Sequence, residues 1–222
     1  LVATTFGQQN IEEGDEIHVI TTHPNRYANH RLAADDLEVD GKLTIHRIAV
    51  PCHRSGMLSQ VRTFSVYSVL SYRLCSEIKP DFLIGTTSRL MTGLLTGVYA
   101  NRFSVPYFID LRDIFSETIS DLFSHNYWLL GLIAKKIFSF LDRRLLSNAV
   151  GVNVVSEAFI EYFQSKEVVT SDWSFFPNGV DEEFIGLPSE IDSTSTTCRT
   201  ILYAGNIGSG QGLETVVPPL AS

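Results

Sequence analysis

The sequence predicts an α/β protein built on a parallel, doubly wound sheet. Two observations lead to this fold class. First, short apolar runs of strand type alternate with helical apolar stripes along nearly all of the 222 residues. Such a βαβα order is typical of parallel strands joined by helical crossovers. Second, several runs are continuously apolar, as expected for strands that are covered on both faces.

Seven segments have the apolar, β-prone composition of strands. Helices separate most of them, and Pro80 marks one junction, because proline disfavours helix at the residue before it. We therefore expect the helix ahead of Pro80 to end there and a strand to begin just after it. The predicted strands cover residues 16–22, 43–50, 82–85, 107–111, 150–155, 173–176 and 200–204.

Helices are predicted over 57–78, 88–102, 126–147 and 156–165. The last of these begins at Ser156, a residue type that caps helix N-termini. In the first, apolar residues three and four apart predict one buried stripe. The stripe consists of Val61, Phe64, Tyr67, Leu70, Leu74 and Ile78.

The domain organisation follows from where these patterns stop. Residues 1–180 are predicted to form one Rossmann-like domain that lacks its first strand, because the chain opens with Leu1 and reads as a helix already under way. A Ser/Thr-rich linker is expected over 181–199, followed over 200–222 by the opening strand, loop and helix of a truncated second domain. No signal peptide is visible, and no apolar run is long enough for a transmembrane helix.

Composition and charge narrow the function classes. An apolar content of 44% suits a packed core. The net charge is −8, but residues 41–109 are locally basic, which suggests an anionic ligand or surface. Solvated faces of separate helices explain the basic residues equally well. Nucleic acid is disfavoured, because no basic cluster is interleaved with aromatic residues in a known binding motif.

The cysteines carry no pairing or metal signal. Cys52, Cys75 and Cys198 lack metal-ligand or CxxC spacing, and an odd, scattered set indicates reduced thiols in a cytosolic protein. We expect Cys75 in a helix core. The sequence shows no metal-binding cluster, and no metal or other cofactor is predicted.

A glycine-rich turn is the strongest binding signal. The segment YAGNIGSGQGLE, residues 203–214, places four glycines between a predicted strand and a predicted helix. Glycine lets a ligand approach the main chain closely, and a helix N-terminus favours phosphate. The alternative is a loop that only turns the chain, since glycine clusters match by chance.

Four other strand-end loops are polar: HPNR at 23–26, GTTSR at 85–89, DLRD at 110–113 and PNGVD at 177–181. The carboxyl ends of parallel strands share one edge of a sheet, so we expect these loops to gather there. Convergent polar groups suit a cleft for a hydroxylated, partly anionic ligand.

Taken together, these motifs resemble the family-4 glycosyltransferases of the GT-B fold, in the branch that builds bacterial surface polysaccharides. The resemblance covers essentially the whole chain in the family's order. It rests on EGDEIHVITTHPN, KPDFLIGTTSRLMTG, VPYFIDLRDIFSE, VNVVSEAFIEYF, PNGVDEEF and LYAGNIGSGQGLE.

The resemblance implies two Rossmann-like domains, an acceptor-side one and a donor-binding one. It also implies retaining transfer from a nucleotide-diphosphate sugar to a glycan or lipid-linked acceptor, usually without a bound metal. Synthesis of surface polysaccharides, lipopolysaccharide among them, places such an enzyme in the cytoplasm or peripherally at the inner face of the plasma membrane. We expect the 222 residues to be inactive by themselves.

At the predicted catalytic position, Arg112 and Asp113 occupy the place of a His-Asp pair found in many relatives. The resemblance implies that Asp113 accepts a hydrogen bond from a sugar hydroxyl and that Arg112 offsets phosphate charge. An Arg–Asp pair that merely holds the strand end is the alternative. Glu117 stands where the branch often has Pro-Glu-Ser, and it either points into the cleft or caps the next helix.

Binding residues follow from the same resemblance. Neutral amides replace the Arg and Lys that many relatives carry in the glycine loop, a substitution that the surface-polysaccharide branch shares. The donor side is expected to consist of Gly205, Asn206, Gly208, Gln211 and Gly212. The acceptor side is expected to consist of His23, Asn25, Thr86, Ser88 and Arg89, for which a helix cap or turn is an equal alternative.

The predicted helix 126–147 has a second possible role. It carries apolar residues beside Lys135, Lys136, Arg143 and Arg144, which suits contact with an anionic bilayer. The alternative is an ordinary domain helix with Ile137 in the core and its cations in water. For the whole protein, a nucleotide-sugar epimerase of the same architecture and a non-catalytic binding module also stay open.

Overall fold

The computed structural model describes residues 15–24, 34–51, 57–87, 90–114, 128–170 and 172–179, with the single positions 203, 213, 215 and 217. The chain divides into two compact units. The first contains Leu1–Ile84 and Leu94–Tyr107, and the second contains Gly85–Gly93 and Phe108–Ser222. The expected linker and truncated second domain lie almost entirely outside the described residues.

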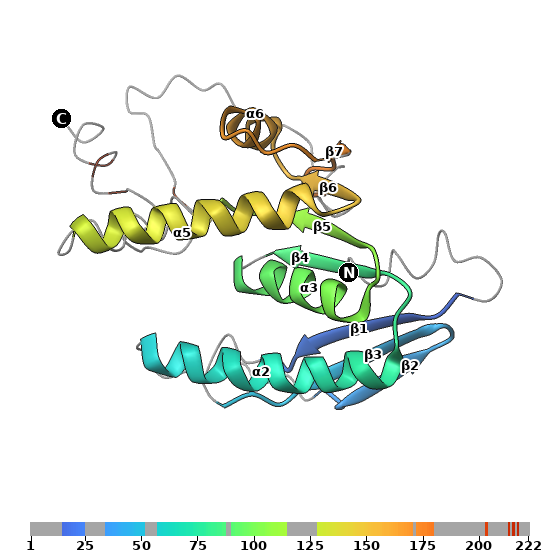
Figure 1. Ribbon diagram of the computed structural model, residues 1–222. Coiled ribbons are helices and arrows are strands. Elements are labelled where there is room, and N and C mark those ends of the chain that lie inside the picture. Colours follow the sequence, from blue (N-terminus) through green and yellow to red (C-terminus); the bar gives the residue numbers. More distant parts are fainter. Residues whose placement is uncertain are drawn as a thin grey trace, which may run out of the picture. The chain divides into compact units, whose positions relative to one another are not determined.

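The first unit contains a three-stranded sheet (Figure 1) of order β1-β3-β2, made by β1 (Ile17–Thr22), β2 (Leu37–Asp40) and β3 (Leu43–Ile48). β1 and β3 are parallel, and their positions confirm the strands predicted at 16–22 and 43–50. Helix α2 (Met57–Ile78) is tied to β1 by the Tyr67 hydroxyl, which donates to the Ile20 carbonyl at 3.2 Å. Burial raises the pKa of Tyr67 to about 12, so the hydroxyl remains a donor at neutral pH.

β2 was not predicted, and it makes this sheet mixed rather than purely parallel. It runs antiparallel to β3 and pairs Asp40 with Leu43 across a two-residue loop. Gly41 begins that loop in the left-handed region, at φ 59°, which side chains disfavour. Glycine at the first position of a two-residue loop is a common hairpin signal, so Gly41 was an available indication in the sequence.

The buried face of α2 differs from the predicted stripe. Val61 is 57% exposed, whereas Ser71 and Cys75 are 3% and 5% exposed. Ser71 Oγ lies 3.0 Å from the hydroxyl of Tyr99 in α3 (Leu90–Phe103). Small side chains at the centre of this face leave room for the Tyr99 ring. The low exposure of Cys75 confirms its predicted position in a helix core.

Two histidines form a close pair between β1 and β3. His18 Nδ1 lies 3.1 Å from His46 Nε2, and the rings are stacked with centroids 5.4 Å apart. One nitrogen must donate and the other accept, so the contact needs at least one neutral ring. Burial, and then the charge of His18, lower the pKa of His46 below its ordinary value of 6.5.

This pair makes stability depend on pH in a defined direction. Because folding lowers the pKa of His46, the folded state favours the neutral ring. The contribution of the neutral His46 ring to stability is fully present above pH 6.5. It is lost as the pH falls from 6.5 through the pKa of His46 in the folded state. Melting temperatures between pH 7.5 and 5.5 should therefore fall less in His46→Gln than in the unaltered protein. Equal slopes would contradict the prediction.

The second sheet has the order β4-β5-β6-β7, formed by β4 (Leu83–Thr87), β5 (Tyr107–Leu111), β6 (Gly151–Val154) and β7 (Trp173–Phe175). β5, β6 and β7 are parallel neighbours. These positions confirm four further strand predictions and the α/β class. All four residues of β6 are buried, as expected for a strand covered on both faces.

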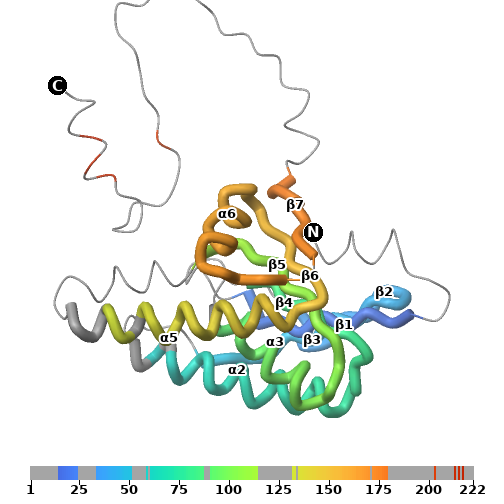
Figure 2. The backbone as a smooth tube through the Cα atoms, turned by 45° about the horizontal axis from the view of Figure 1, so that its top comes forward, coloured from blue at the N-terminus to red at the C-terminus, as the bar shows by residue number. Residues whose placement is uncertain are grey.

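Helices α5 (Trp128–Ser147) and α6 (Glu157–Ser165) belong to the second unit (Figure 2). Phe163 of α6 is 3% exposed and stacks on Trp173 of β7, with the ring centroids 6.3 Å apart. Ser156 occupies the N-cap of α6, as predicted, but its side chain makes no capping hydrogen bond. The predicted N-cap position is confirmed, and the hydroxyl contributes no hydrogen bond to it.

Candidate functional site

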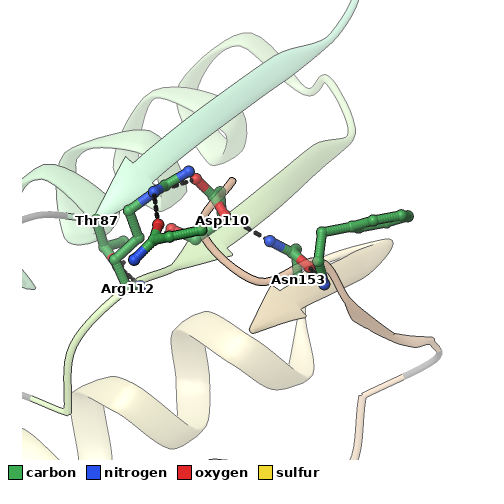
Figure 3. A network of polar contacts seen from close by, with 6 residues as sticks. Thr87, Asp110, Arg112 and Asn153 are labelled. Carbon is green, nitrogen blue, oxygen red and sulfur yellow. Dashed lines mark hydrogen bonds and ion pairs between the residues drawn. The ribbon is translucent and has the colours of Figure 1, made fainter. Parts of the chain in front are cut away.

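A connected polar network lies at the carboxyl ends of the second sheet's strands (Figure 3). Asp110 is the penultimate residue of β5, and Asn153 holds the same place in β6. The register pairs the two residues directly, so their side chains share one face of the sheet. Asn153 Nδ2 donates to Asp110 Oδ1 at 2.7 Å, which joins β5 to β6 at this edge.

Arg112 completes the network just beyond β5. Its Nε donates to Asp110 Oδ2 at 2.8 Å, and its Nη1 donates to Asn178 Oδ1 at 2.6 Å. The Asp110 side chain is 13% exposed and the Arg112 side chain 31%. The guanidinium is therefore held from two sides, by a carboxylate on β5 and by an amide in the loop after β7.

Buried groups behind the guanidinium are satisfied. Thr87 is 1% exposed, and its Oγ1 donates to the Asp110 carbonyl and accepts from the Arg112 backbone N–H, both at 3.3 Å. Asn153 Oδ1 accepts the Phe176 backbone N–H at 2.8 Å. Because every bond here restrains another group, the network orients Arg112 before any ligand arrives.

The guanidinium retains donors toward solvent. An arginine carries five N–H groups, and the bonds to Asp110 and Asn178 use Nε and one Nη1 hydrogen. Among the described residues, no hydrogen bond engages Nη2. A partly exposed guanidinium with N–H groups left over is suited to charge-assisted hydrogen bonds with phosphate oxygens.

Asp113 lies beside this network but is not part of it. It is exposed, and it makes no hydrogen bond or ion pair with another described residue. Partial burial nevertheless raises the pKa of its carboxyl by removing solvent from the charged form. Of the two readings of the Arg112-Asp113 pair, a mutual ion pair is wrong, because Arg112 bonds to Asp110 instead.

Sequence reasoning did not name Asn153, and it counted Asp110 only as one of the polar groups in the DLRD loop. Each stands inside an otherwise apolar strand, in YFIDL and GVNV. A polar residue in a run that reads as buried is an informative signal, because burial requires a hydrogen-bonding partner. That signal would have selected both residues, although not their pairing.

The other predicted residues are placed as follows. Thr86 is exposed, and the neighbouring Thr87 enters the network in its place. His23 follows β1 in the first unit, where its Nε2 lies 2.8 Å from Asp36 Oδ1. Residues outside the described part of the chain are Asn25, Ser88, Arg89, Glu117, Gly205, Asn206, Gly208, Gln211 and Gly212.

Two wider searches gave negative results for the described ranges. No group of three or more His, Cys, Asp or Glu in them is arranged to hold a metal ion. None of the described helices combines the length and the apolar character required to cross a bilayer.

Comparison with known proteins adds family information. The chain matches the family model described as "Glycosyl transferase 4-like domain" over residues 8–179. It is also 25% identical over 226 residues to the "Putative colanic acid biosynthesis glycosyl transferase WcaI" of Escherichia coli (strain K12). That alignment covers 92% of this chain but 54% of the relative, so the chain spans about half the length of the curated relative.

Two solved structures are similar at low identity. One is UGT73P12 of Glycyrrhiza uralensis, complexed with glycyrrhetinic acid 3-O-monoglucuronide, with 13% identity, a TM-score of 0.44 and coverage of 78% of this chain and 44% of that one. The other is a ugt transferase from Siraitia grosvenorii in complex with UDP, with 10% identity, a TM-score of 0.37 and coverage of 61% and 38%. Likenesses at these TM-scores add nothing to the description of the site.

Proposed function

The chain belongs to the family of glycosyl transferase 4-like domains, and from this premise we propose that it is part of a glycosyltransferase. The enzyme moves a sugar from a nucleotide-diphosphate sugar to a glycan or lipid-linked acceptor. Surface-polysaccharide synthesis is the proposed setting, which agrees with the colanic acid role in the relative's name. Lipopolysaccharide is one such product.

The observation that carries the proposal is the fixed guanidinium of Arg112. Asp110 and Asn178 hold it at 2.8 and 2.6 Å, and its Nη2 group makes no hydrogen bond to a described residue. As the nucleotide leaves, negative charge develops on an oxygen of its diphosphate. A donor already oriented toward that charge stabilises the transition state without reorganising during the reaction.

Asp113 is assigned a different role beside it. Its exposed carboxyl makes no protein contact among the described residues, so it is available to accept a hydrogen bond from a hydroxyl of the donor sugar. Such a bond would orient the anomeric carbon. We propose that transfer retains configuration and that neither a bound metal nor another cofactor takes part.

The remaining assignments are proposals of the same kind. Glu117 joins the catalytic group, and the enzyme works in the cytoplasm, with a peripheral site at the inner membrane face. Donor binding is assigned to Gly205, Asn206, Gly208, Gln211 and Gly212, and acceptor binding to His23, Asn25, Thr86, Ser88 and Arg89. The expectation that the 222 residues do not transfer sugar by themselves stays a prediction.

The test uses the full-length protein. A panel of nucleotide sugars is screened for protection against heat unfolding, and we expect one to stabilise the protein by about 2.7 kcal/mol at a hundred times its Kd. With that donor, labelled sugar should appear on an acceptor glycan, and omission of the acceptor should abolish turnover.

Three results would each contradict a part of the proposal. Release of an epimerised sugar without acceptor would identify an epimerase. If Asp113→Ala keeps both donor binding and sugar transfer, Asp113 is not part of the site. A chelator arm tests the metal-free mechanism, because transfer that stops with EDTA and returns with a divalent cation requires a metal.

A further inference from the structure

A groove of about 410 Å³ lies between α5 and α6 in the second unit. α6 lies over the C-terminal half of α5 in both views (Figures 1 and 2). Four cations line the groove, and none of the described residues along it is acidic. They are Lys135, Lys136, Arg143 and Lys166.

Arg143 ties the two helices together. Its Nη2 donates to the carbonyl of Lys166, the C-cap residue of α6, at 2.6 Å. It also lies 3.6 Å from the exposed Glu167 carboxylate. Lys166 Nζ lies 5.1 Å from the centre of the Tyr162 ring. Side chains from two helices therefore converge on one basic groove, and the bond between Arg143 and α6 sets their spacing.

Beside the groove, α5 exposes an apolar stripe. Ile133, Ile137 and Phe140 are 51%, 52% and 62% exposed, and their spacing of four and three places them on one helix face. The core position that the ordinary-helix alternative gives to Ile137 is therefore wrong. The buried face carries Leu145 and Leu146, at 5% and 1%.

We propose that this surface, the α5–α6 groove with its adjacent stripe, docks on an anionic lipid bilayer and that the groove holds a lipid phosphate. The inference rests on the proposed function, which places a lipid-linked acceptor at a membrane. Charge complementarity selects the occupant, because cations meet the phosphate level while large apolar side chains enter the acyl boundary.

A bilayer also accounts for the combination of both features. A free phosphate would require the cations but leave the apolar stripe facing water. A purely apolar partner would require the stripe but would place apolar groups against the ammonium groups of the groove, which is costly. Lysine side chains next to an inserted apolar face can instead extend their ammonium groups to the headgroups.

The experiment measures sedimentation of the full-length protein with vesicles. We expect binding to vesicles containing phosphatidylglycerol and little binding to phosphatidylcholine alone. Lys135→Gln and Lys166→Gln should each weaken binding about fivefold, and Phe140→Ala about tenfold. Arg73→Gln is the matched control, because it removes one exposed cation from α2, outside the groove lining and the apolar stripe, and it should weaken binding less than twofold.

Each other outcome overturns the inference. An equal loss in Arg73→Gln would mean diffuse charge attraction, and equal binding to neutral vesicles would exclude headgroup recognition. Binding of inorganic phosphate without vesicle binding would identify a free-phosphate site. Sugar transfer to a soluble acceptor is measured on the same preparations. If transfer persists while vesicle binding is absent, the inference fails and the proposed function stands.

Discussion

Replacement of Arg112 by Gln in the full-length enzyme should lower kcat/KM for sugar transfer about 100- to 1000-fold, the usual cost of removing one preorganised charge stabiliser. Gln can place its amide nitrogen near the position of the Arg112 Nε that bonds Asp110, but it carries no positive charge. The loss should appear mainly in kcat, because the charge on the leaving diphosphate grows as the transition state forms.

Two further variants make this result specific. Arg112→Lys should recover only part of the activity, since an ammonium group cannot bond Asp110, Asn178 and a phosphate in the planar arrangement of a guanidinium. Arg144→Gln, an exposed cation on α5, should retain activity toward a soluble acceptor. Melting temperatures identify any variant that loses activity by unfolding. A folded Arg112→Gln variant with normal kcat would show that the network is structural only.

Replacement of Ile109 by Ala should lower the free energy of unfolding by about 3 kcal/mol. Ile109 is 0% exposed in β5, directly before Asp110. Truncation removes buried methyl groups and leaves a cavity in a close-packed region. Urea unfolding of the full-length protein, followed by a probe in this unit, measures the change.

Ile137→Ala is the matched control for Ile109→Ala. It makes the same chemical change in the same unit, but at a side chain that is 52% exposed. Its cost should be under about 1 kcal/mol. Equal losses in both variants would show that burial in β5 does not set the stability of this unit.

Some features of the fold could be predicted with accuracy. Strand β5 was predicted at its observed bounds, Tyr107–Leu111, because a continuous apolar run between two helices has few other interpretations. Helix α2 was likewise predicted at Met57–Ile78. The hairpin at Gly41 was missed because β2 is short and exposed on all four residues, so its apolar pattern is weak.

The polar network around Arg112 contains partners that the sequence analysis did not pair with it. Arg112 was selected from its place after β5, and the structure does put it in a polar network at that edge. The alternative in which Arg112 pairs with Asp113, the next residue, is wrong, because Asp110 holds its guanidinium. Alternate residues of an extended chain lie on the same side. The side chains of positions 110 and 112 therefore lie together, and that of position 113 points the other way.

The sequence by itself determined the order of strands and helices and the polar character of the strand ends, because local apolar periodicity and breaker residues encode both. Only the tertiary structure decided that Asn153 and Asn178 meet Asp110 and Arg112, and that α6 completes the basic groove on α5. These contacts join residues as many as 66 positions apart. They depend on strand register and helix packing, which no local pattern specifies.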